Sequence, residues 1–176
     1  MGHLKGIKMF DDIFNDKEMI EMQNLLFKHN KSITCAESCT GGLVASLITK
    51  ISGSSNIFNG SIVSYSNKIK NQELNVSNKT LENFGAVSVE TVKEMLRGVL
   101  KKFDADYAIA ISGVAGPTGG TKNKPVGCVV IGFMDSLGHQ DIDIFHFFGT
   151  REEIQIQAAK SSLKKISKFL QKTLDK

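Results

Sequence analysis

Hydrophobic residues recur at helical spacing in five parts of the chain. The most regular run is 88–103, where apolar residues from Val89 to Phe103 form one stripe. A second run follows Thr40, its predicted N-cap, and ends before Gly53. The same reasoning predicts further helices over 16–29, 66–74 and 150–174.

Short apolar runs between these helices have the composition of strands. They cover residues 32–36, 57–65, 106–112, 126–133 and 141–148. The last two flank DSLGHQ (135–140), which predicts a hairpin. Strands that alternate with helices, followed by a hairpin and a helix, predict an α/β protein: a single-domain layered α/β/α fold with a mixed β-sheet.

Length and composition favour one domain. With 176 residues and 41% hydrophobic content, the chain is long enough to bury a full core. The first eight residues, MGHLKGIK, show no periodicity, so we expect a flexible segment over 1–15 and a domain over 16–176. The net charge of +4 comes from 22 basic and 18 acidic residues that are mostly scattered, which favours small anionic metabolites over nucleic acid as partners.

Cysteine usage favours a cytoplasmic location. Cys35, Cys39 and Cys128 are an odd number without zinc-ligand spacing, and no secretory signal is recognisable. We therefore expect reduced thiols in the cytoplasm. No apolar stretch approaches the roughly 18 to 20 residues that a membrane-spanning helix needs, so we expect no membrane partner.

The sequence ESCTGG (37–42) lies between a predicted strand and a predicted helix. Unpaired N–H groups at a helix start favour an oxyanion or a phosphate, and Gly41 and Gly42 let a ligand approach the backbone. Ser38 is therefore a candidate nucleophile with an oxyanion site made from nearby N–H groups. A capped helix with a glycine-rich entry explains the same residues, and the local sequence leaves both interpretations open.

A serine nucleophile needs a base, and the histidines are weak candidates. His3 lies near the terminus, His29 ends a helix, and His139 and His146 lie in or near the predicted hairpin. The alternatives are lysine and tyrosine.

YSNKIK (65–70) supplies Tyr65, Lys68 and Lys70. A free lysine with a pKa of about 10.4 is neutral in only about 1 molecule in 2,500 at pH 7. A lysine base therefore needs burial or a neighbouring cation that lowers its pKa by roughly 3 units, about 4 kcal/mol. Lysines near a helix start are also common as solvated surface residues.

A glycine-rich loop, SGVAGPTGGTKNKPVG (112–127), follows the third predicted strand. It is not a Walker A loop, because no glycine directly precedes Lys122 and Asn123 replaces the required Ser or Thr. Its N–H groups suit a phosphate or ribose, although a flexible connection has the same composition. Arg151, at the start of the last helix, is a second candidate for an anion, with a partner on its own helix as the alternative.

Together these segments resemble the CinA C-terminal domain family, the nicotinamide-nucleotide amidases, in its stand-alone form. The resemblance covers about residues 18 to 172 and is carried, in order, by ESCTGG, GSIVSYSNKIK, GAVS, ISGVAGPTGG, KPVG and FFGTR. Larger family members have an extra N-terminal domain of the molybdopterin type, which this chain is too short to contain. The resemblance implies hydrolysis of the carboxamide of nicotinamide mononucleotide to nicotinic acid mononucleotide and ammonia, with no metal and no cofactor.

The resemblance also implies roles for individual residues. The family's serine nucleophile falls on Ser38 and its lysine base on Lys70, which acts directly or through Tyr65. Lys68 occupies a variable position, and its charge would help to lower the pKa of Lys70. Glu37 would face the pyridinium charge. The oxyanion would be held by N–H groups of Cys39, Thr40 and Gly41. Gly42 is a further substrate-binding candidate. Contacts toward the phosphate would come from Gly113, Gly116, Thr118, Gly119, Gly120 and Arg151.

Two positions depart from the family pattern. Thr150 stands where an aspartate is common, and Gln155 stands where a further arginine is frequent, which predicts altered phosphate or inter-subunit contacts. A non-catalytic module of the same fold that senses or binds a nucleotide is the main alternative, and a hydrolase of another small amide is a third. The presence of Ser38 and Lys70 favours the enzyme. Family likeness also suggests a homo-oligomer, most simply a dimer.

Overall fold

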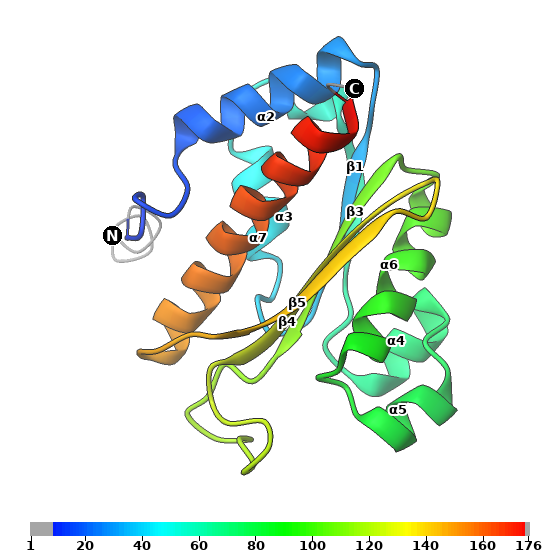
Figure 1. Ribbon diagram of the computed structural model, residues 1–176, viewed down its shortest axis with the longest axis vertical. Helices are drawn as coiled ribbons and strands as arrows, with labels where there is room; N and C mark the ends of the chain where they lie inside the picture. Colours follow the sequence, from blue (N-terminus) through cyan, green and yellow to red (C-terminus); the bar gives the residue numbers. More distant parts are fainter. Residues whose placement is uncertain (1–8, 175–176) are drawn as a thin grey trace.

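Five strands form one sheet between two layers of helices (Figure 1). The computed structural model describes residues 9–174, so residues 1–8 of the predicted flexible segment lie outside the described part. The strands are β1 (Ile33–Glu37), β2 (Phe58–Val63), β3 (Tyr107–Gly113), β4 (Cys128–Asp135) and β5 (Gln140–His146). The helices are α2 (Asp16–Lys28), α3 (Leu43–Thr49), α4 (Asn67–Leu74), α5 (Asn78–Phe84), α6 (Val89–Phe103) and α7 (Arg151–Leu174), with a short 3-10 helix, η1 (Ser54–Asn56).

The sheet is mixed, with the strand order β2-β1-β3-β4-β5. β1 pairs in parallel with both β2 and β3, whereas β4 is antiparallel to β3 and to β5. The connection between β4 and β5 is the predicted hairpin. The predicted fold class, a layered α/β/α domain with a mixed sheet, is confirmed.

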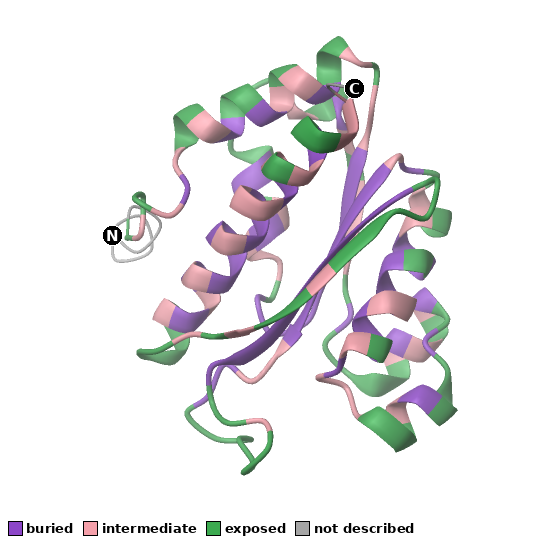
Figure 2. Ribbon diagram, viewed as in Figure 1, coloured by how far each residue is buried: buried purple, intermediate pink, exposed green. Residues whose placement is uncertain are grey.

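Each face of the sheet covers its own hydrophobic core. Along β3, Tyr107, Ile109 and Ile111 belong to the core shared with α2, α3 and α7, whereas Ala108 and Ala110 belong to the core shared with α4 and α6. Figure 2 shows the central strands buried and β5 exposed at the edge. Burial on both faces explains why β1, β3 and β4 read as continuous apolar runs in the sequence.

The chain just before α2 packs onto the domain. Phe14 is 3% exposed and joins the core, and the side chain of Asn15 caps α2. Asp11 forms an ion pair with Lys160, which is buried in α7. Residues 9–15 therefore belong to the domain and not to the flexible segment that we predicted, because a buried aromatic ring and a helix cap hold them in place.

The start of α3 differs from the prediction. The helix begins at Leu43, with Gly42 in place of Thr40 as its N-cap. Gly41 and Gly42 adopt positive φ angles of 63° and 99°, which extend the turn after β1. The hydroxyl of Thr40 donates instead to the carboxylate of Glu37.

α4 lies very close to α6 because position 98 is a glycine. A Cβ atom at Gly98 would lie 2.0 Å from the carbonyl oxygen of Leu74, a distance that no side chain tolerates. This contact fixes the position of α4 against the sheet. α5, which the sequence analysis did not predict, follows as a short helix capped by Ser77.

Candidate active site

Three parallel strands end side by side at the lower edge of the sheet in Figure 1. Ser38 follows β1, Ser64 follows β2, and Gly113 ends β3. The N–H of Ser38 donates to the carbonyl of Ile111 at 3.0 Å, and the N–H of Ser64 donates to that of Glu37 at 2.8 Å. Ligand sites of open α/β folds lie outside the carboxyl ends of such strands, so this edge is the candidate site.

Lys70 reaches Ser38 from the helical layer of α4. Its Nζ lies 3.0 Å from the Oγ of Ser38 and donates to the carbonyl of Ser64 at 2.7 Å. A longer contact of 3.4 Å joins Nζ to the carbonyl of Tyr65. The structure therefore brings together two residues that are 32 positions apart in the sequence.

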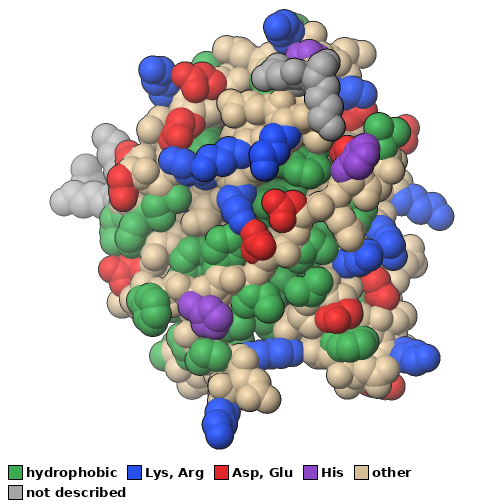
Figure 3. Space-filling model, viewed as in Figure 1, with side chains coloured by type: hydrophobic (Ala, Val, Ile, Leu, Met, Phe, Trp, Pro, Cys, Tyr) green, Lys and Arg blue, Asp and Glu red, His purple; other side chains and the backbone are tan. Residues whose placement is uncertain are grey.

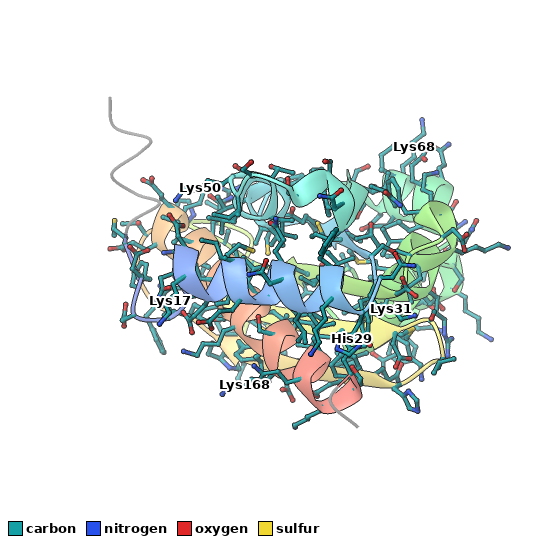
Figure 4. The ribbon with its side chains drawn as sticks, turned by 90° about the horizontal axis from the view of Figure 1, so that it is seen from above. Lys17, His29, Lys31, Lys50, Lys68 and Lys168 are labelled. Atoms are coloured by element: carbon teal, nitrogen blue, oxygen red, sulfur yellow. The ribbon has the colours of Figure 1, made fainter. Side chains whose placement is uncertain are left out.

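Burial controls the protonation of Lys70. The residue is 1% exposed, and the three contacts of its Nζ are uncharged oxygens. Burial lowers the pKa of Lys70 from 10.5 to about 8, which is most of the shift that a lysine base requires. Lys68 is exposed and extends away from the domain (Figure 4), and burial rather than its charge causes the shift, so its predicted influence on Lys70 is wrong.

Glu37 is buried inside the turn. It is 0% exposed, and its carboxylate accepts hydrogen bonds from the N–H groups of Gly42, Val44 and Ala45 and from the hydroxyl of Thr40. The predicted contact of Glu37 with a pyridinium ring is therefore wrong. The N–H of Gly42 is occupied by this carboxylate, but the residue itself is half-buried, so its contact with a substrate stays a prediction.

Two N–H groups of the turn after β1, beside Ser38, meet no acceptor among the described residues. The N–H of Gly41 donates to the carbonyl of Ser38 at 3.1 Å, so its predicted role in holding an oxyanion is wrong. Burial raises the pKa of the Cys39 thiol to about 12, which leaves the thiol unreactive. Among residues 9–174 the N–H groups of Cys39 and Thr40 meet no acceptor. These two are the available donors for an oxyanion.

Tyr65 and Arg151 form a bridge at the mouth of the site. Tyr65 is 58% exposed, and its hydroxyl accepts from the guanidinium of Arg151 at 2.6 Å. The other terminal nitrogen of Arg151 donates to the carbonyl of Gly116 at 2.7 Å. Arg151 thus binds across the site instead of along its own helix. A relay through Tyr65 is not needed, because Lys70 contacts Ser38 directly.

The glycine-rich loop borders the site with exposed residues. Thr118, Gly119 and Gly120 are exposed, whereas Gly113 is half-buried at the end of β3. Lys124 anchors the loop by donating to the carbonyl of Phe84 at 2.6 Å. Within residues 9–174, no hydrogen bond joins the three exposed residues to the catalytic pair, so their contact with a substrate stays a prediction.

Two residues that the sequence analysis did not assign to the site contact it. The carbonyl of Ser64 accepts the shortest hydrogen bond of Lys70. Gln155 lies one turn after Arg151 in α7, and its Nε2 donates to the carbonyl of Cys39 at 2.8 Å. The spacing of four residues from Arg151 places both side chains on one face of the helix and is the sequence signal for Gln155.

Other polar groups and hollows lie away from this site. His139 bonds Asp135 at the β4–β5 hairpin, beside a cavity of about 740 Å³, and a cavity of about 300 Å³ lies between α2 and α7. On the face drawn in Figure 3, positive and negative side chains are intermingled. Within residues 9–174, no cluster of His, Cys, Asp and Glu suits a metal ion, and no helix has the length and apolar character of a membrane span.

The sequence is similar to curated CinA-like proteins. It matches the CinA C-terminal domain over residues 16–170. It is 48% identical to a CinA-like protein of Endomicrobium trichonymphae over 90% of this chain and 37% of that protein. It is 47% identical to a CinA-like protein of Syntrophomonas wolfei over 89% of this chain and 37% of that protein. The chain thus spans little more than a third of the length of these relatives.

Solved structures share the fold over most of both chains. A competence-damaged protein (CinA) superfamily protein from Klebsiella pneumoniae aligns with a TM-score of 0.84 and 31% identity, over 88% of this chain and 96% of that one. A competence/damage inducible protein from Agrobacterium tumefaciens aligns with a TM-score of 0.80 and 32% identity, over 90% and 96%. On the sequence match and the shared fold together, the chain belongs to the CinA C-terminal domain family.

Proposed function

We propose that this protein hydrolyses the carboxamide of nicotinamide mononucleotide to nicotinic acid mononucleotide and ammonia. The observation that carries the proposal is the contact of 3.0 Å between Ser38 and a lysine that is 1% exposed. A solvated lysine stays protonated near neutral pH, whereas Lys70, with a pKa of about 8, has a substantial neutral fraction. A neutral amine beside a serine hydroxyl is a general base for acyl transfer.

The proposed reaction proceeds through an acyl-enzyme. The Oγ of Ser38 attacks the carboxamide carbon while Lys70 takes the hydroxyl proton. The oxyanion that forms is held by the N–H groups of Cys39 and Thr40. Lys70 then returns the proton to the leaving nitrogen, the C–N bond breaks and ammonia departs. A water molecule, deprotonated by Lys70, hydrolyses the ester and regenerates Ser38.

The phosphate of the substrate fits the mouth of the site. Arg151 uses two terminal nitrogens on Tyr65 and Gly116, and a guanidinium carries five N–H donors in all, so donors remain for an anion. The exposed residues Thr118 to Gly120 belong to the same loop as Gly116, whose carbonyl accepts from Arg151. We propose that the phosphate lies between this loop and Arg151.

Ammonia release from nicotinamide mononucleotide tests the proposal. We expect the wild type to form ammonia and nicotinic acid mononucleotide in equal amounts. Ser38→Ala and Lys70→Met should each lower kcat by at least about a thousandfold. Lys68→Ala is the matched control, because Lys68 lies on the same helix but is exposed, and it should retain full activity.

The non-catalytic sensor predicts a different result. A wild type that releases no more ammonia than Ser38→Ala would exclude the amidase, and calorimetric binding of the intact nucleotide would then support the sensor. Turnover of another small amide, with none of the nucleotide, would support the third interpretation.

The cytoplasmic location and the homodimer stay predictions. Sedimentation of the purified chain measures its oligomeric state. A monomer at micromolar concentration would contradict the predicted dimer without affecting the chemistry proposed for Ser38.

A further inference from the structure

We propose that Gln155 is a positioning residue that orients the peptide group between Cys39 and Thr40, so that the N–H of Thr40 faces the oxyanion. The inference rests on the proposed function, since it assigns a part in acyl transfer at Ser38. It gives a role to Gln155, a position at which this chain departs from the family pattern.

The geometry of one peptide group carries the inference. Nε2 of Gln155 donates to the carbonyl of Cys39 at 2.8 Å, so this carbonyl points toward α7. In a planar trans peptide the C=O and the following N–H point in opposite directions. The N–H of Thr40 therefore points away from α7. Lys70 approaches Ser38 from the helical layer on that side of the sheet.

Three other donors of the turn are already occupied. The N–H of Ser38 donates to the carbonyl of Ile111 in β3, and that of Gly41 closes a turn on Ser38 itself. The N–H of Gly42 donates to the buried carboxylate of Glu37. The N–H groups of Cys39 and Thr40 thus remain for a developing negative charge, and the hydrogen bond from Gln155 acts on the peptide group that carries the second of them.

Two side chains hold Thr40 in place, Glu37 at the end of β1 and Gln155 in α7. Glu37 accepts from its hydroxyl at 2.6 Å, and Gln155 fixes the peptide bond that precedes it. The peptide group that Gln155 contacts rotates about bonds of Cys39 and Thr40, and the hydrogen bond from Gln155 restrains that rotation.

Loss of that constraint should slow the chemical step and leave binding intact. Removal of an oxyanion donor lowers kcat by about 10² to 10³, and a donor that is present but misaligned loses part of this. We therefore expect kcat to fall by about ten- to a hundredfold in Gln155→Met, a variant of similar length without a donor. KM should change less than about twofold, because the donor acts on the transition state.

The test uses p-nitrophenyl acetate as well as the nucleotide. In this reaction Ser38 attacks the acetyl carbon, Lys70 takes the serine proton, p-nitrophenolate leaves, and water hydrolyses the acetyl-serine. Gln155→Met is compared with Gln155→Lys, which restores an N–H donor on a flexible side chain. Gln157→Met is the control, because Gln157 donates to the carbonyls of Phe148 and Glu153 and does not touch the turn.

We expect acetylation of Ser38 to slow in Gln155→Met, to recover at least severalfold in Gln155→Lys and to be unchanged in Gln157→Met. The midpoint of the pH profile should stay where the wild type has it, since Lys70 is untouched. Equal rates for wild type and Gln155→Met would overturn the inference and leave the proposed chemistry standing. A shifted midpoint, or a slower rate that Gln155→Lys does not recover, would also overturn it. A wild type that is not acetylated at Ser38 would overturn the inference together with the chemistry.

Discussion

The rate of amide hydrolysis should follow the deprotonation of Lys70. Burial lowers the pKa of Lys70 from 10.5 to about 8. The neutral fraction is then about 9% at pH 7, about 50% at pH 8 and about 91% at pH 9. If the neutral amine is the base, kcat/KM should rise about tenfold between pH 7 and pH 9 and then level off.

The assay is ammonia release at low substrate concentration across pH 6 to 10. An ordinary lysine, with a pKa of 10.5, would give a rise of about a hundredfold over the same interval, with no plateau below pH 10. Such a profile would refute the claim that burial lowers the pKa of Lys70. So would a profile that is flat from pH 6 to 10. Lys68→Ala should leave the midpoint in place, because this exposed lysine does not influence Lys70.

The remaining predictions concern stability and binding. Charged Lys70 opposes folding below pH 8, because its pKa is about 8 in the folded state and 10.5 in the unfolded state. Lys70→Met should therefore be more stable than wild type at pH 7 by up to about 3 kcal/mol, measured by urea unfolding. This difference in the free energy of unfolding should shrink as pH rises from 8 to 10.5. Glu37→Gln should lower the free energy of unfolding by about 3 kcal/mol in the same assay, because N–H donors at the start of α3 lose their carboxylate; an unchanged midpoint would contradict the buried cap. Gly98→Ala should destabilise the domain by about 2 kcal/mol or more, measured by thermal unfolding, because its Cβ collides with the carbonyl of Leu74. Arg151→Ala should raise KM for the nucleotide by about tenfold or more with a smaller change in kcat, and an unchanged KM would exclude Arg151 as a phosphate ligand.

The strongly periodic elements were predictable from the sequence. The apolar stripe predicted over 88–103 appears in the structure as α6 (Val89–Phe103), and the helix predicted over 66–74 appears as α4 (Asn67–Leu74). The start of α3 was not predictable, because it depends on the direction of one carboxylate. Glu37 reads as a polar turn residue in the sequence, whereas in the structure it points inward and replaces Thr40 in satisfying the first turn of the helix.

The site was predictable in its residues but not in its contacts. Ser38 and Lys70 were identified by motif, yet the depth of burial that lowers the pKa of Lys70 follows from the packing of α4 against the sheet and α6. The sequence marked Gln155 only as a departure from the family pattern, in which an arginine is frequent at this position. Its contact with Cys39 joins residues 116 positions apart, and such long-range pairing leaves no local signature in the sequence.

The pKa of Lys70 itself is the most direct test of the account. Titration of ¹³Cε-labelled lysine by NMR, with the Lys70 resonance assigned by its absence in Lys70→Met, measures this pKa without any substrate. We predict a midpoint near 8, well below the value of about 10.4 for an ordinary solvated lysine. A midpoint of about 10 or above would mean that the amine beside Ser38 is charged under working conditions and would contradict its role as the base.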